Sequence, residues 1–584
     1  MIQTPSLLKT VIIKLHMKST QLFVWFLLLT IATTLLADDP PRPNVLIFLM
    51  DDMGYGDIHA LNPKGSGFAT PNLDALVAKG VTFTHAHSSA SVCAPTRYSL
   101  LTGNHVYRGR LPGGTWSHFQ GSQILQGQET IADLLKSIGY STAFFGKGHL
   151  GSSFLRGDGK RATDFNNADL SRRFQDGPRD HGFDYSLTLP GGIQSEPYAF
   201  FQNDQLARWD DIDKRWQTFS SDKEARTYFR EEKRGGKKAA YVMDNWSTET
   251  VGPLLMRDAL SFIDDHVSRT RGEKPFFIHY CSQAGHTPYA PPVAFNPDNP
   301  LETNDLNARG ATAIAGRTIN KRTDMILEAD VALGLFIEKL NELDILANTL
   351  ILFTSDNGVA VGPRSTWTNP IYRDVKDQIP YGGNRLEVDA MNSQRVHRDA
   401  QGVALNGRPL RGEKGFVYEG GHRVPFIVRW DSGIPANHLI SNQLIGLHDV
   451  FATIAGIVGV EVEPDQANDS FDFSKVLRNP ETEQTLVRET LFIQSNRPWE
   501  QNNKKFNRTW AVYQATEVRP KLNLWKGVLE TNSRQPNGKA KALGVELFHL
   551  SSDPSESENV QNPSLLEKMQ NQFRHLSNQP RTAP

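Results

Sequence analysis

The chain has 584 residues, with 63 Lys and Arg against 64 Asp and Glu, and its net charge is −1. This balance argues against a nucleic-acid-binding protein, because there is no excess of cations to displace counterions from phosphates. A hydrophobic share of 39% is enough for a large core, whereas two cysteines cannot build a disulfide scaffold. We therefore expect a large globular enzyme.

Residues 1–37 have the layout of a secretory signal peptide. Lys9, Lys14 and Lys18 precede the apolar run Leu22–Leu36, which is short for a membrane span of about 20 residues. An uncleaved anchor is the alternative, because Leu35 occupies a position where cleavage sites favour a small residue. We expect a secreted or periplasmic protein with no stable membrane span after the signal peptide is cleaved.

Apolar runs of strand length alternate with helical patterns from residue 44 onwards. The expected strands are residues 44–50, 141–145, 275–280, 349–354 and 424–428, and the expected helices are residues 71–79, 325–343 and 449–459. Such continuous apolar runs are typical of strands buried on both faces of a parallel sheet. The alternation predicts an α/β fold with a large, mostly parallel sheet sandwiched by helices.

Two stretches between these elements have weak periodicity. Residues 150–251 and 358–411 are rich in polar and aromatic side chains, and we expect both to form long loops. The acidic, polar segment Glu461–Ser470 predicts a boundary, with a catalytic domain over residues 40–460 and a smaller domain over residues 461–584.

Acidic side chains follow two of the expected strands. Asp51 and Asp52 close the first, and Asp356 and Asn357 close the strand at 349–354. Ligands of open α/β sheets bind beyond the carboxyl ends of the strands, so these groups can converge there. Three carboxylates and an amide oxygen suit Ca²⁺ or Mg²⁺ better than Zn²⁺. Either pair alone is also ordinary turn chemistry.

The segment Cys93–Arg97 (CAPTR) combines a nucleophile with a helix start and a guanidinium group. Pro95 suits the first turn of a helix, so Cys93 would lie at the helix N-terminus, where free amides favour an anion. Arg97, four residues later, would lie on the same helical face. A buried cysteine in a loop before a helix is the alternative reading of the same residues.

Cys-x-Pro-x-Arg resembles the signature of the formylglycine-dependent sulfatases, an arylsulfatase-like family within the alkaline-phosphatase-like superfamily. Nearly all of the chain after residue 40 is similar to this family, and the implied fold is alkaline-phosphatase-like with a smaller C-terminal α+β domain. The segments that carry the resemblance, in the family's order around Cys93–Arg97, are Pro43–Asp57, Gly146–His149, Ala284–Pro288, Asn348–Gly358, Arg411–Pro425 and Glu546–Val560.

The resemblance implies a role for each matching residue. A formylglycine-generating maturation enzyme would oxidise Cys93 to formylglycine. The implied ligands of Ca²⁺, which we favour over Mg²⁺, are Asp51, Asp52, the modified Cys93, Asp356 and Asn357. The implied groups around the sulfate are Arg97, Lys147, His149, His286 and Lys414. Each lysine or histidine, taken alone, could equally be a surface or structural residue.

The family's chemistry explains why a modified cysteine is needed. The hydrated aldehyde at position 93 supplies one hydroxyl as nucleophile, with Asp356 as the acceptor of its proton. His286 would protonate the departing alcohol. A second hydroxyl, deprotonated with help from His149, expels sulfate and restores the aldehyde. Cys281 matches no functional position and is expected to be a buried thiol, since a Cys93–Cys281 disulfide would consume the nucleophile.

The resemblance leaves the substrate open. A sulfated carbohydrate is favoured over a small sulfated molecule, because the stretch at 358–411 leads from the metal residues to Lys414 and carries side chains that suit sugars and anions. These are Trp367, Tyr372, Tyr381, Arg364, Arg373, Arg385, Arg395 and Arg398. The alternatives are a phosphonate or phosphate monoester hydrolase of the same superfamily, and an inactive relative that only binds.

Overall fold

The structure is a computed structural model. It describes residues 42–583 apart from 64–65, 117, 211–214, 234–238, 361–409, 436–437, 481–482, 484, 496–498, 502–503, 507–508, 519–521, 532–541 and 577. The expected signal peptide and the aromatic and arginine residues expected to contact substrate from the 358–411 stretch therefore lie outside the described residues. Within the described residues, no helix is long and apolar enough to cross a membrane.

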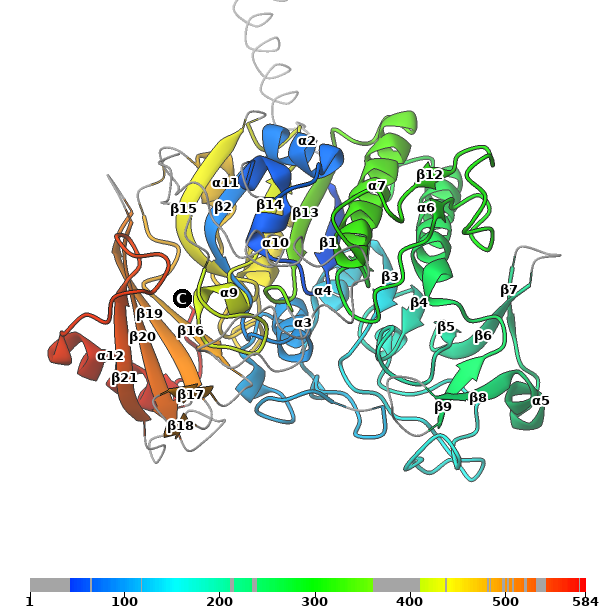
Figure 1. Cartoon of the computed structure of the whole chain (residues 1–584), viewed down its shortest axis with the longest axis horizontal. Coiled ribbons are helices and arrows are strands. Elements are labelled where there is room, and N and C mark those ends of the chain that lie inside the picture. Colours follow the sequence, from blue (N-terminus) through cyan, green and yellow to red (C-terminus); the bar gives the residue numbers. More distant parts are fainter. Residues whose placement is uncertain are drawn as a thin grey trace, which may run out of the picture. The chain divides into compact units, whose positions relative to one another are not determined.

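An eleven-stranded sheet forms the centre of the unit Pro43–Pro584 (Figure 1). Its order is β15-β2-β14-β13-β1-β10-β3-β4-β5-β6-β7. In that order the strands are Leu439–Gly446, Val81–His87, Phe426–Arg429, Thr349–Ser355, Asn44–Met50, Phe276–Cys281, Ser141–Lys147, Tyr185–Leu189, Phe200–Gln202, Gln205–Asp210 and Arg215–Thr218.

The middle of this sheet is parallel, and its residues explain why. Strand β1 pairs in parallel with β13 on one side and β10 on the other, and β10 pairs in parallel with β3. Every residue of β1 and β13 is buried, as the continuous apolar runs require. The five strands expected from sequence are all present, and β14 is antiparallel to both neighbours.

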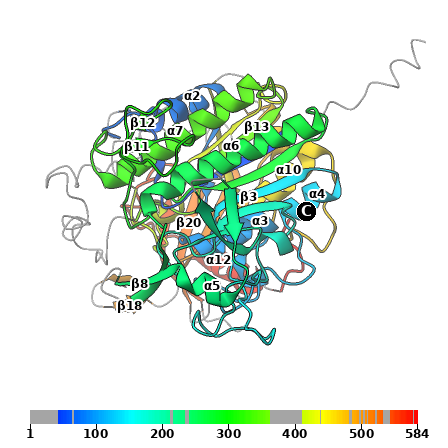
Figure 2. The same cartoon turned by 90° about the vertical axis from the view of Figure 1, so that its right-hand side faces the viewer.

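Helices cover both faces of the sheet. Alternate residues of β1 point to opposite faces, so Leu46 and Phe48 pack against α2 (Pro71–Lys79), α6 (Val251–Thr270) and α7 (Lys321–Glu342). Val45 and Ile47 pack against α3 (Cys93–Thr102), α4 (Ile131–Ser137) and α10 (Asp449–Val458). Figure 2 shows α6 and α7 running side by side across their face. The predicted α/β class, a mostly parallel sheet between helices, is confirmed.

The expectation of long loops over residues 150–251 holds up to residue 184, where one short 3-10 turn lies between β3 and β4, and it is wrong for residues 185–243. Strands β4 to β7 extend the large sheet there, and α5 (Asp222–Thr227), β8 (Phe229–Lys233) and β9 (Ala239–Met243) follow. These strands are short and mostly antiparallel. In β7 the burial is only partial, so an edge strand of this kind needs no continuous apolar run. The sequence signal used for the central strands is therefore missing.

A smaller antiparallel sheet forms the C-terminal part (orange and red in Figure 1), as expected for the smaller domain. Its order is β16-β19-β20-β21, and the strands are Thr490–Gln494, Thr509–Glu517, Asn523–Thr531 and Ala542–His549. Helix α12 (Pro563–Leu576) packs on it through Met569 and Phe573. The remaining short elements are α9 (Glu419–His422), α11 (Ser474–Arg478), β11 (Ala294–Phe295), β12 (Thr312–Ala313), β17 (Trp499–Gln501) and β18 (Lys504–Phe506).

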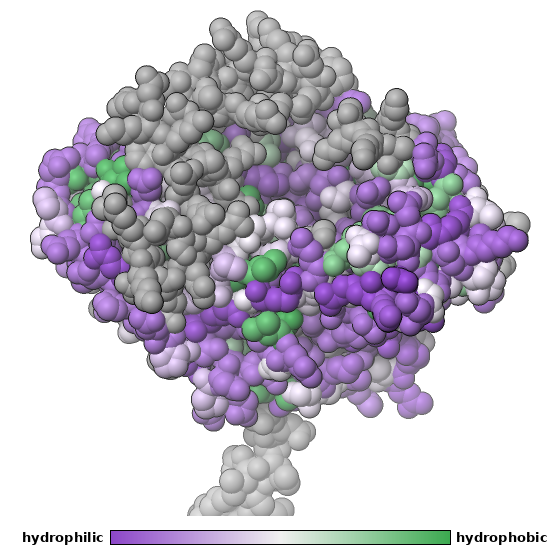
Figure 3. All heavy atoms as spheres, turned by 90° about the horizontal axis from the view of Figure 1, so that it is seen from below, coloured by the Kyte–Doolittle hydropathy of each residue, from purple (hydrophilic) through white to green (hydrophobic). Residues whose placement is uncertain are grey.

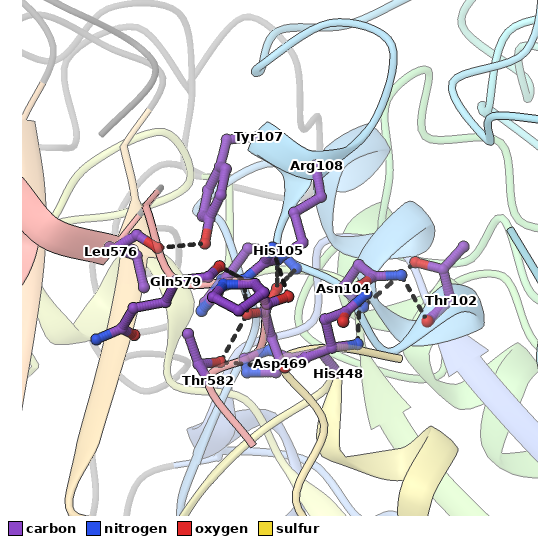
Figure 4. Close-up of polar contacts among 12 residues, drawn as sticks. Thr102, Asn104, His105, Tyr107, Arg108, His448, Asp469, Leu576, Gln579 and Thr582 are labelled. Carbon is purple, nitrogen blue, oxygen red and sulfur yellow. Dashed lines mark hydrogen bonds and ion pairs between the residues drawn. The ribbon is translucent and has the colours of Figure 1, made fainter. Parts of the chain in front are cut away.

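The segment after α12 returns to the large domain at the end of α3 (Figure 4). Asp469 is buried and accepts hydrogen bonds from the Arg108 guanidinium at 2.7 and 2.9 Å, from the His105 amide at 2.7 Å and from the Thr582 hydroxyl at 2.6 Å. Tyr107 donates to the carbonyl of Leu576 at 3.4 Å. One carboxylate thus holds the C-terminal segment against the loop that follows α3.

Candidate active site

The carboxyl ends of adjacent parallel strands bring together groups that lie about 300 positions apart. Met50 is paired with Ser355 in the register of β1 and β13, so Asp51 and Asp52 emerge beside Asp356 and Asn357. The Asp52 amide donates to Asp356 Oδ1 at 3.3 Å, and Asn357 Nδ2 donates to Asp52 Oδ1 at 2.7 Å. All four side chains are buried. The four residues expected as ligands from different strands therefore form one cluster.

Cys93 is the first residue of α3 and lies beside this cluster. It is 3% exposed, and its Sγ is 3.2 Å from His149 Nδ1. The Cys93 sulfur and one carboxylate oxygen from each of Asp51 and Asp356 all lie within 4.8 Å of one another. The start of a ten-residue helix offers unpaired amides to an anion at this point.

Arg97 connects α3 to the strand ends. Its Nε and Nη2 donate to Asp356 Oδ2 at 2.9 and 2.6 Å, and its Nη1 donates to the Lys147 carbonyl at 3.0 Å. The guanidinium is 1% exposed. Such a doubly bonded pair fixes the orientation of the carboxylate as well as its charge. Arg97 therefore lies within the cluster, where it orients Asp356.

Two lysines and a histidine contact the aspartate pair. Lys147 Nζ, from the end of β3, is 2.7 Å from Asp51 Oδ2. Lys414 Nζ is 2.6 Å from Asp52 Oδ1, and His286 Nε2 is 3.7 Å from Asp52 Oδ2. Every residue assigned from sequence to the metal or to the sulfate therefore belongs to one cluster, which is buried except for Lys414, whose side chain is 13% exposed.

The charges of this cluster balance and shift the pKa values of its carboxyl groups. Burial raises the pKa of Asp356 well above its ordinary value, and the negative charge of Asp51 adds to the rise. Burial acts the same way on Asp51, but Lys147, His286 and Arg97 outweigh it and hold the pKa of Asp51 far below the usual range. Asp51 is therefore more firmly ionised than Asp356.

Both histidines of the site are neutral at pH 7. Burial lowers the pKa of His149 well below its ordinary value, and Lys147 adds to this effect. Burial together with Lys414 lowers the pKa of His286 to about 4, although the two aspartates oppose the shift. A neutral imidazole can accept a proton, whereas donation requires that an anion first raise its pKa.

The donor set fits a hard divalent cation. Asp51 Oδ1 and Asn357 Oδ1 are buried oxygens that have no hydrogen-bond partner among the described residues. Leaving a buried acceptor unsatisfied costs about 1–3 kcal/mol, and a cation bound by these oxygens removes that cost. Carboxylate and amide oxygens are the ligands that Ca²⁺ and Mg²⁺ take.

Sequence reasoning missed the polar groups that surround the site. Ser495, which follows β16, donates from its hydroxyl to the Gly415 carbonyl at 2.7 Å, next to Lys414. The Ser91 amide, two residues before Cys93, donates to the Gln494 carbonyl at 2.9 Å. No local pattern identifies these contacts, because each joins segments about 80 to 400 positions apart in the chain. Cys281 is a buried free thiol, as expected.

Glu328 of α7 makes the stability of the protein depend on pH. It is 3% exposed and accepts one hydrogen bond, from Gln283 Nε2 at 3.0 Å, and burial raises its pKa from 4.5 to about 8. Between these values the unfolded chain has released the proton and the folded chain has kept it, so the free energy of unfolding falls as pH rises.

We expect Glu328→Gln to remove most of that dependence. The amide has almost the same shape and can donate to Gln283 Oε1, which has no partner among the described residues. Relative to the wild type, the variant should gain stability at pH 8, by a few kcal/mol in order of magnitude, and little at pH 4.5. Denaturant unfolding at the two pH values measures this gain. An equal change at both would contradict the assignment.

The comparisons with known proteins agree on one family. The sulfatase family model matches residues 43–460. The chain is 26% identical over 570 residues to an N-acetylgalactosamine-6-O-sulfatase of Bacteroides thetaiotaomicron. This alignment covers 90% of this chain and 92% of that protein. It is 27% identical over 565 residues to an N-acetylgalactosamine-6-sulfatase of Sus scrofa, covering 91% of this chain and 84% of that one.

A solved structure has the same fold. It was reported with the metabolism of multiple glycosaminoglycans by Bacteroides thetaiotaomicron, and it covers 92% of this chain and 100% of its own. Its TM-score is 0.65 at 23% sequence identity. The large sheet, its helices and the small C-terminal sheet therefore belong to one common architecture.

Proposed function

The chain belongs to the sulfatase family, and from this we propose that it hydrolyses sulfate esters of carbohydrates at Cys93 after oxidation of that residue to formylglycine. The observation that carries the proposal is the position of Cys93. Its Sγ lies at the N-terminus of α3, 3.2 Å from His149, within a cluster that contains the buried cations Arg97 and Lys147 and the partly exposed Lys414. A nucleophile surrounded by fixed positive charge suits a substrate whose own oxygens repel attack.

The metal and the modified residue would each have a defined role. Ca²⁺ would be held by Asp51, Asp52, Asp356, Asn357 and residue 93, and it would polarise the sulfate oxygens. Formylglycine at position 93, when hydrated, would offer two hydroxyl groups, one as the nucleophile and one for the release of sulfate. Maturation requires a formylglycine-generating enzyme, and the family resemblance together with the N-terminal pattern supports an exported, secreted or periplasmic protein.

The chain's own side chains would carry out the remaining steps. Lys147 and Lys414 each hold one aspartate oxygen at 2.6–2.7 Å, and their ammonium groups can bind the sulfate oxygens. Arg97 keeps Asp356 oriented as proton acceptor for the nucleophile. His149, neutral and in contact with position 93, can take a proton there.

His286 is the proposed donor to the departing alcohol. Its pKa of about 4 must rise for this role. Binding of an anionic sulfate beside the ring supplies the required charge, because a nearby negative group favours the protonated form. His286 would thus become protonated only when substrate is bound.

We propose a 6-sulfated N-acetylhexosamine of a glycosaminoglycan as the first substrate to test, because the two relatives above are named for N-acetylgalactosamine 6-sulfate. Within the chain, we assign the chemistry to residues 40–460 and regard residues 461–584 as a supporting domain. An arylsulfatase activity on artificial esters would follow from the same site.

The test is a panel of matched esters given to the matured protein. Release of inorganic sulfate from N-acetylgalactosamine 6-sulfate, from its oligosaccharides and from an aryl sulfate is compared with release of phosphate from the corresponding phosphate esters. We expect kcat/KM for the sulfated sugar to exceed that for its phosphate analogue at least about 100-fold, a difference of about 2.7 kcal/mol. A preference for the phosphate or phosphonate ester would favour the alternative hydrolase. Turnover of none of the esters would favour a binding relative.

A further inference from the structure

We propose that Lys526, in the small C-terminal sheet, is a positioning residue for Lys414. The proposal rests on the proposed function, in which Lys414 binds the sulfate. Lys526 is in β20 and fully buried, at 0% exposure. It lies among residues of the segment 410–423, which carries Lys414 and ends in α9. Lys526 of the supporting domain would therefore determine the position of Lys414 in the active site.

Two carboxylates hold the Lys526 ammonium group. Nζ is 3.0 Å from Glu419 Oε1 and 2.7 Å from Glu556 Oε1. Glu556 also accepts a hydrogen bond at 2.8 Å from the amide of Glu419, and Arg423 lies 3.5 Å from the other Glu419 oxygen. Two buried carboxylates thus face two buried cations. Removing one partner of such a group leaves an uncompensated charge, which typically costs about 3–5 kcal/mol.

Two histidines adjoin Lys526 and Glu419. Ring nitrogens of His87 and His422 lie within 4.8 Å of a Glu419 oxygen, a grouping that could hold a metal ion. Lys526 Nζ is 3.3 Å from His422 Nε2, so the ammonium already supplies the positive charge. Burial lowers the pKa of both imidazoles, and neither adds a competing charge.

From Glu419 the constraint reaches Lys414 through backbone contacts. The Gly420 amide donates to the Arg411 carbonyl at 2.7 Å, which closes the segment into a loop around Lys414. The Lys414 amide donates to the Val359 carbonyl at 2.9 Å, and the Gly358 amide donates to the Gly421 carbonyl at 3.0 Å. Gly358 and Val359 directly follow the metal residue Asn357. A movement of α9 therefore moves Lys414 relative to the metal cluster.

The packing at this contact leaves little freedom. A Cβ built on Gly358 would lie 2.0 Å from the Gly420 carbonyl oxygen, and a Cβ on Gly420 would lie 2.3 Å from that of Gly412. The backbones thus approach more closely than any side chain permits. Because close-packed interiors transmit strain, loss of the charge that holds Glu419 should displace the segment as a unit.

Other contacts hold the same segment to the C-terminal sheet. Arg411 lies 3.3 Å from Glu546 of β21, and Ser495 bonds to the Gly415 carbonyl. These hold the ends and the middle of the loop at the surface of the small sheet. Lys526 differs from them in being fully buried and in contacting two carboxylates at once. We therefore expect that, of these contacts, loss of Lys526 has the largest effect on the position of Lys414.

The test uses a charge-balanced variant and a double-mutant cycle. Lys526→Met alone leaves two carboxylates against one cation and could unfold the chain. In the double variant Lys526→Met with Glu556→Gln, the charges of Glu419 and Arg423 still cancel. The side-chain amide oxygen introduced at position 556 can still accept a hydrogen bond from the Glu419 amide. In the otherwise unchanged holoenzyme, we expect this pair to lower kcat/KM for the sulfated sugar about 10- to 100-fold, as loss of an outer partner of a site typically does.

The cycle asks whether the loss acts through Lys414. In a Lys414→Ala background the same pair of substitutions should lower kcat/KM less than about twofold, because the side chain that Lys526 positions is absent. A full 10- to 100-fold loss in that background would overturn the proposal, and so would a folded pair that retains wild-type turnover. Arg108→Met is the matched control. It breaks the Arg108–Asp469 contact between the C-terminal region and the large domain (Figure 4), and it should lower Tm with an equal, small effect on turnover in both backgrounds.

A crystal structure of the charge-balanced double variant tests the proposal independently of enzyme activity. We expect Lys414 Nζ to have left Asp52 Oδ1, from which it is 2.6 Å away in the wild type. An unchanged Lys414 would overturn the proposal. Wild-type protein that hydrolyses no sulfate ester would instead contradict the proposed function, and this structure would still decide the positioning role.

Discussion

Replacing Cys93 by alanine lowers kcat on every sulfate ester by at least about 10⁴-fold, because loss of a catalytic nucleophile typically costs 10⁴ to 10⁶. Alanine cannot be oxidised to an aldehyde and so offers neither hydroxyl. The surrounding charges remain, since the contacts of Arg97 with Asp356 and of Lys147 with Asp51 do not involve the thiol. Substrate binding should therefore survive, and the loss should appear in kcat. Initial rates of sulfate release over a range of substrate concentrations separate kcat from KM.

The matched control is the second cysteine. Cys281 is equally buried, at 1% exposed, and it ends β10 in the same sheet. Cys281→Ala should cost about 1–2 kcal/mol of stability through the small cavity it leaves, and it should keep turnover within about threefold. Wild-type activity in Cys93→Ala would show that the nucleophile lies elsewhere.

We expect that replacing Asp51 by asparagine raises the dissociation constant for Ca²⁺ at least about 100-fold and lowers turnover by a similar factor. Asp51 is more firmly ionised than Asp356, and one of its oxygens has no hydrogen-bond partner among the described residues. Asparagine has the same shape but offers the metal no negative charge. It also leaves Lys147 without its carboxylate partner, and breaking such a buried pair costs about 3 kcal/mol or more. Calorimetric titration of Ca²⁺ into chelated protein measures the affinity, and added Ca²⁺ should restore the turnover of chelated wild-type protein.

A buried aspartate away from the site controls for the loss of charge itself. Asp330 accepts from the amides of Asn72 and Leu73 at the start of α2. Asp330→Asn should lower stability by about 1–2 kcal/mol through those hydrogen bonds, with Ca²⁺ affinity unchanged. If Asp51→Asn bound Ca²⁺ as tightly as the wild type, the ligand assignment would be wrong.

The centre of the fold could be predicted because its strands are buried on both sides. Residues 44–50 and 349–354 are apolar at nearly every position, and the structure places both in the middle of the sheet. The edge strands could not be recognised in this way. Residues 215–218 alternate charged, aromatic and polar side chains and are half exposed, so their strand conformation depends on pairing with a neighbour and not on a local pattern.

The site was predictable to the extent that it follows from strand ends. Asp51 and Asp356 end adjacent parallel strands, so their approach is a consequence of topology. The sequence predicts that Arg97 lies on the same helical face as Cys93, but it does not predict the pairing of Arg97 with Asp356. Lys526 gave no signal at all, because a buried lysine is recognised only once its carboxylate partners are known.

On the face seen in Figure 3, the described residues form no pattern that indicates where substrate binds. The face seen in Figure 3 is hydrophilic over most of its described residues, with small separate hydrophobic patches. Recognition of a sulfated sugar needs fixed charges more than apolar area. Of the cations at the site, Arg97 and Lys147 are buried and the side chain of Lys414 is only 13% exposed, so a surface pattern reveals little of them.

The most direct measurement relates the rate of sulfate release to the chemical state of residue 93. Protein is prepared with graded amounts of a formylglycine-generating enzyme, and mass spectrometry of the peptide around Thr96 gives the fraction of aldehyde in each sample. The account predicts that turnover of N-acetylgalactosamine 6-sulfate rises in proportion to that fraction and vanishes for the pure thiol. Full turnover by protein that carries only the Cys93 thiol would contradict it.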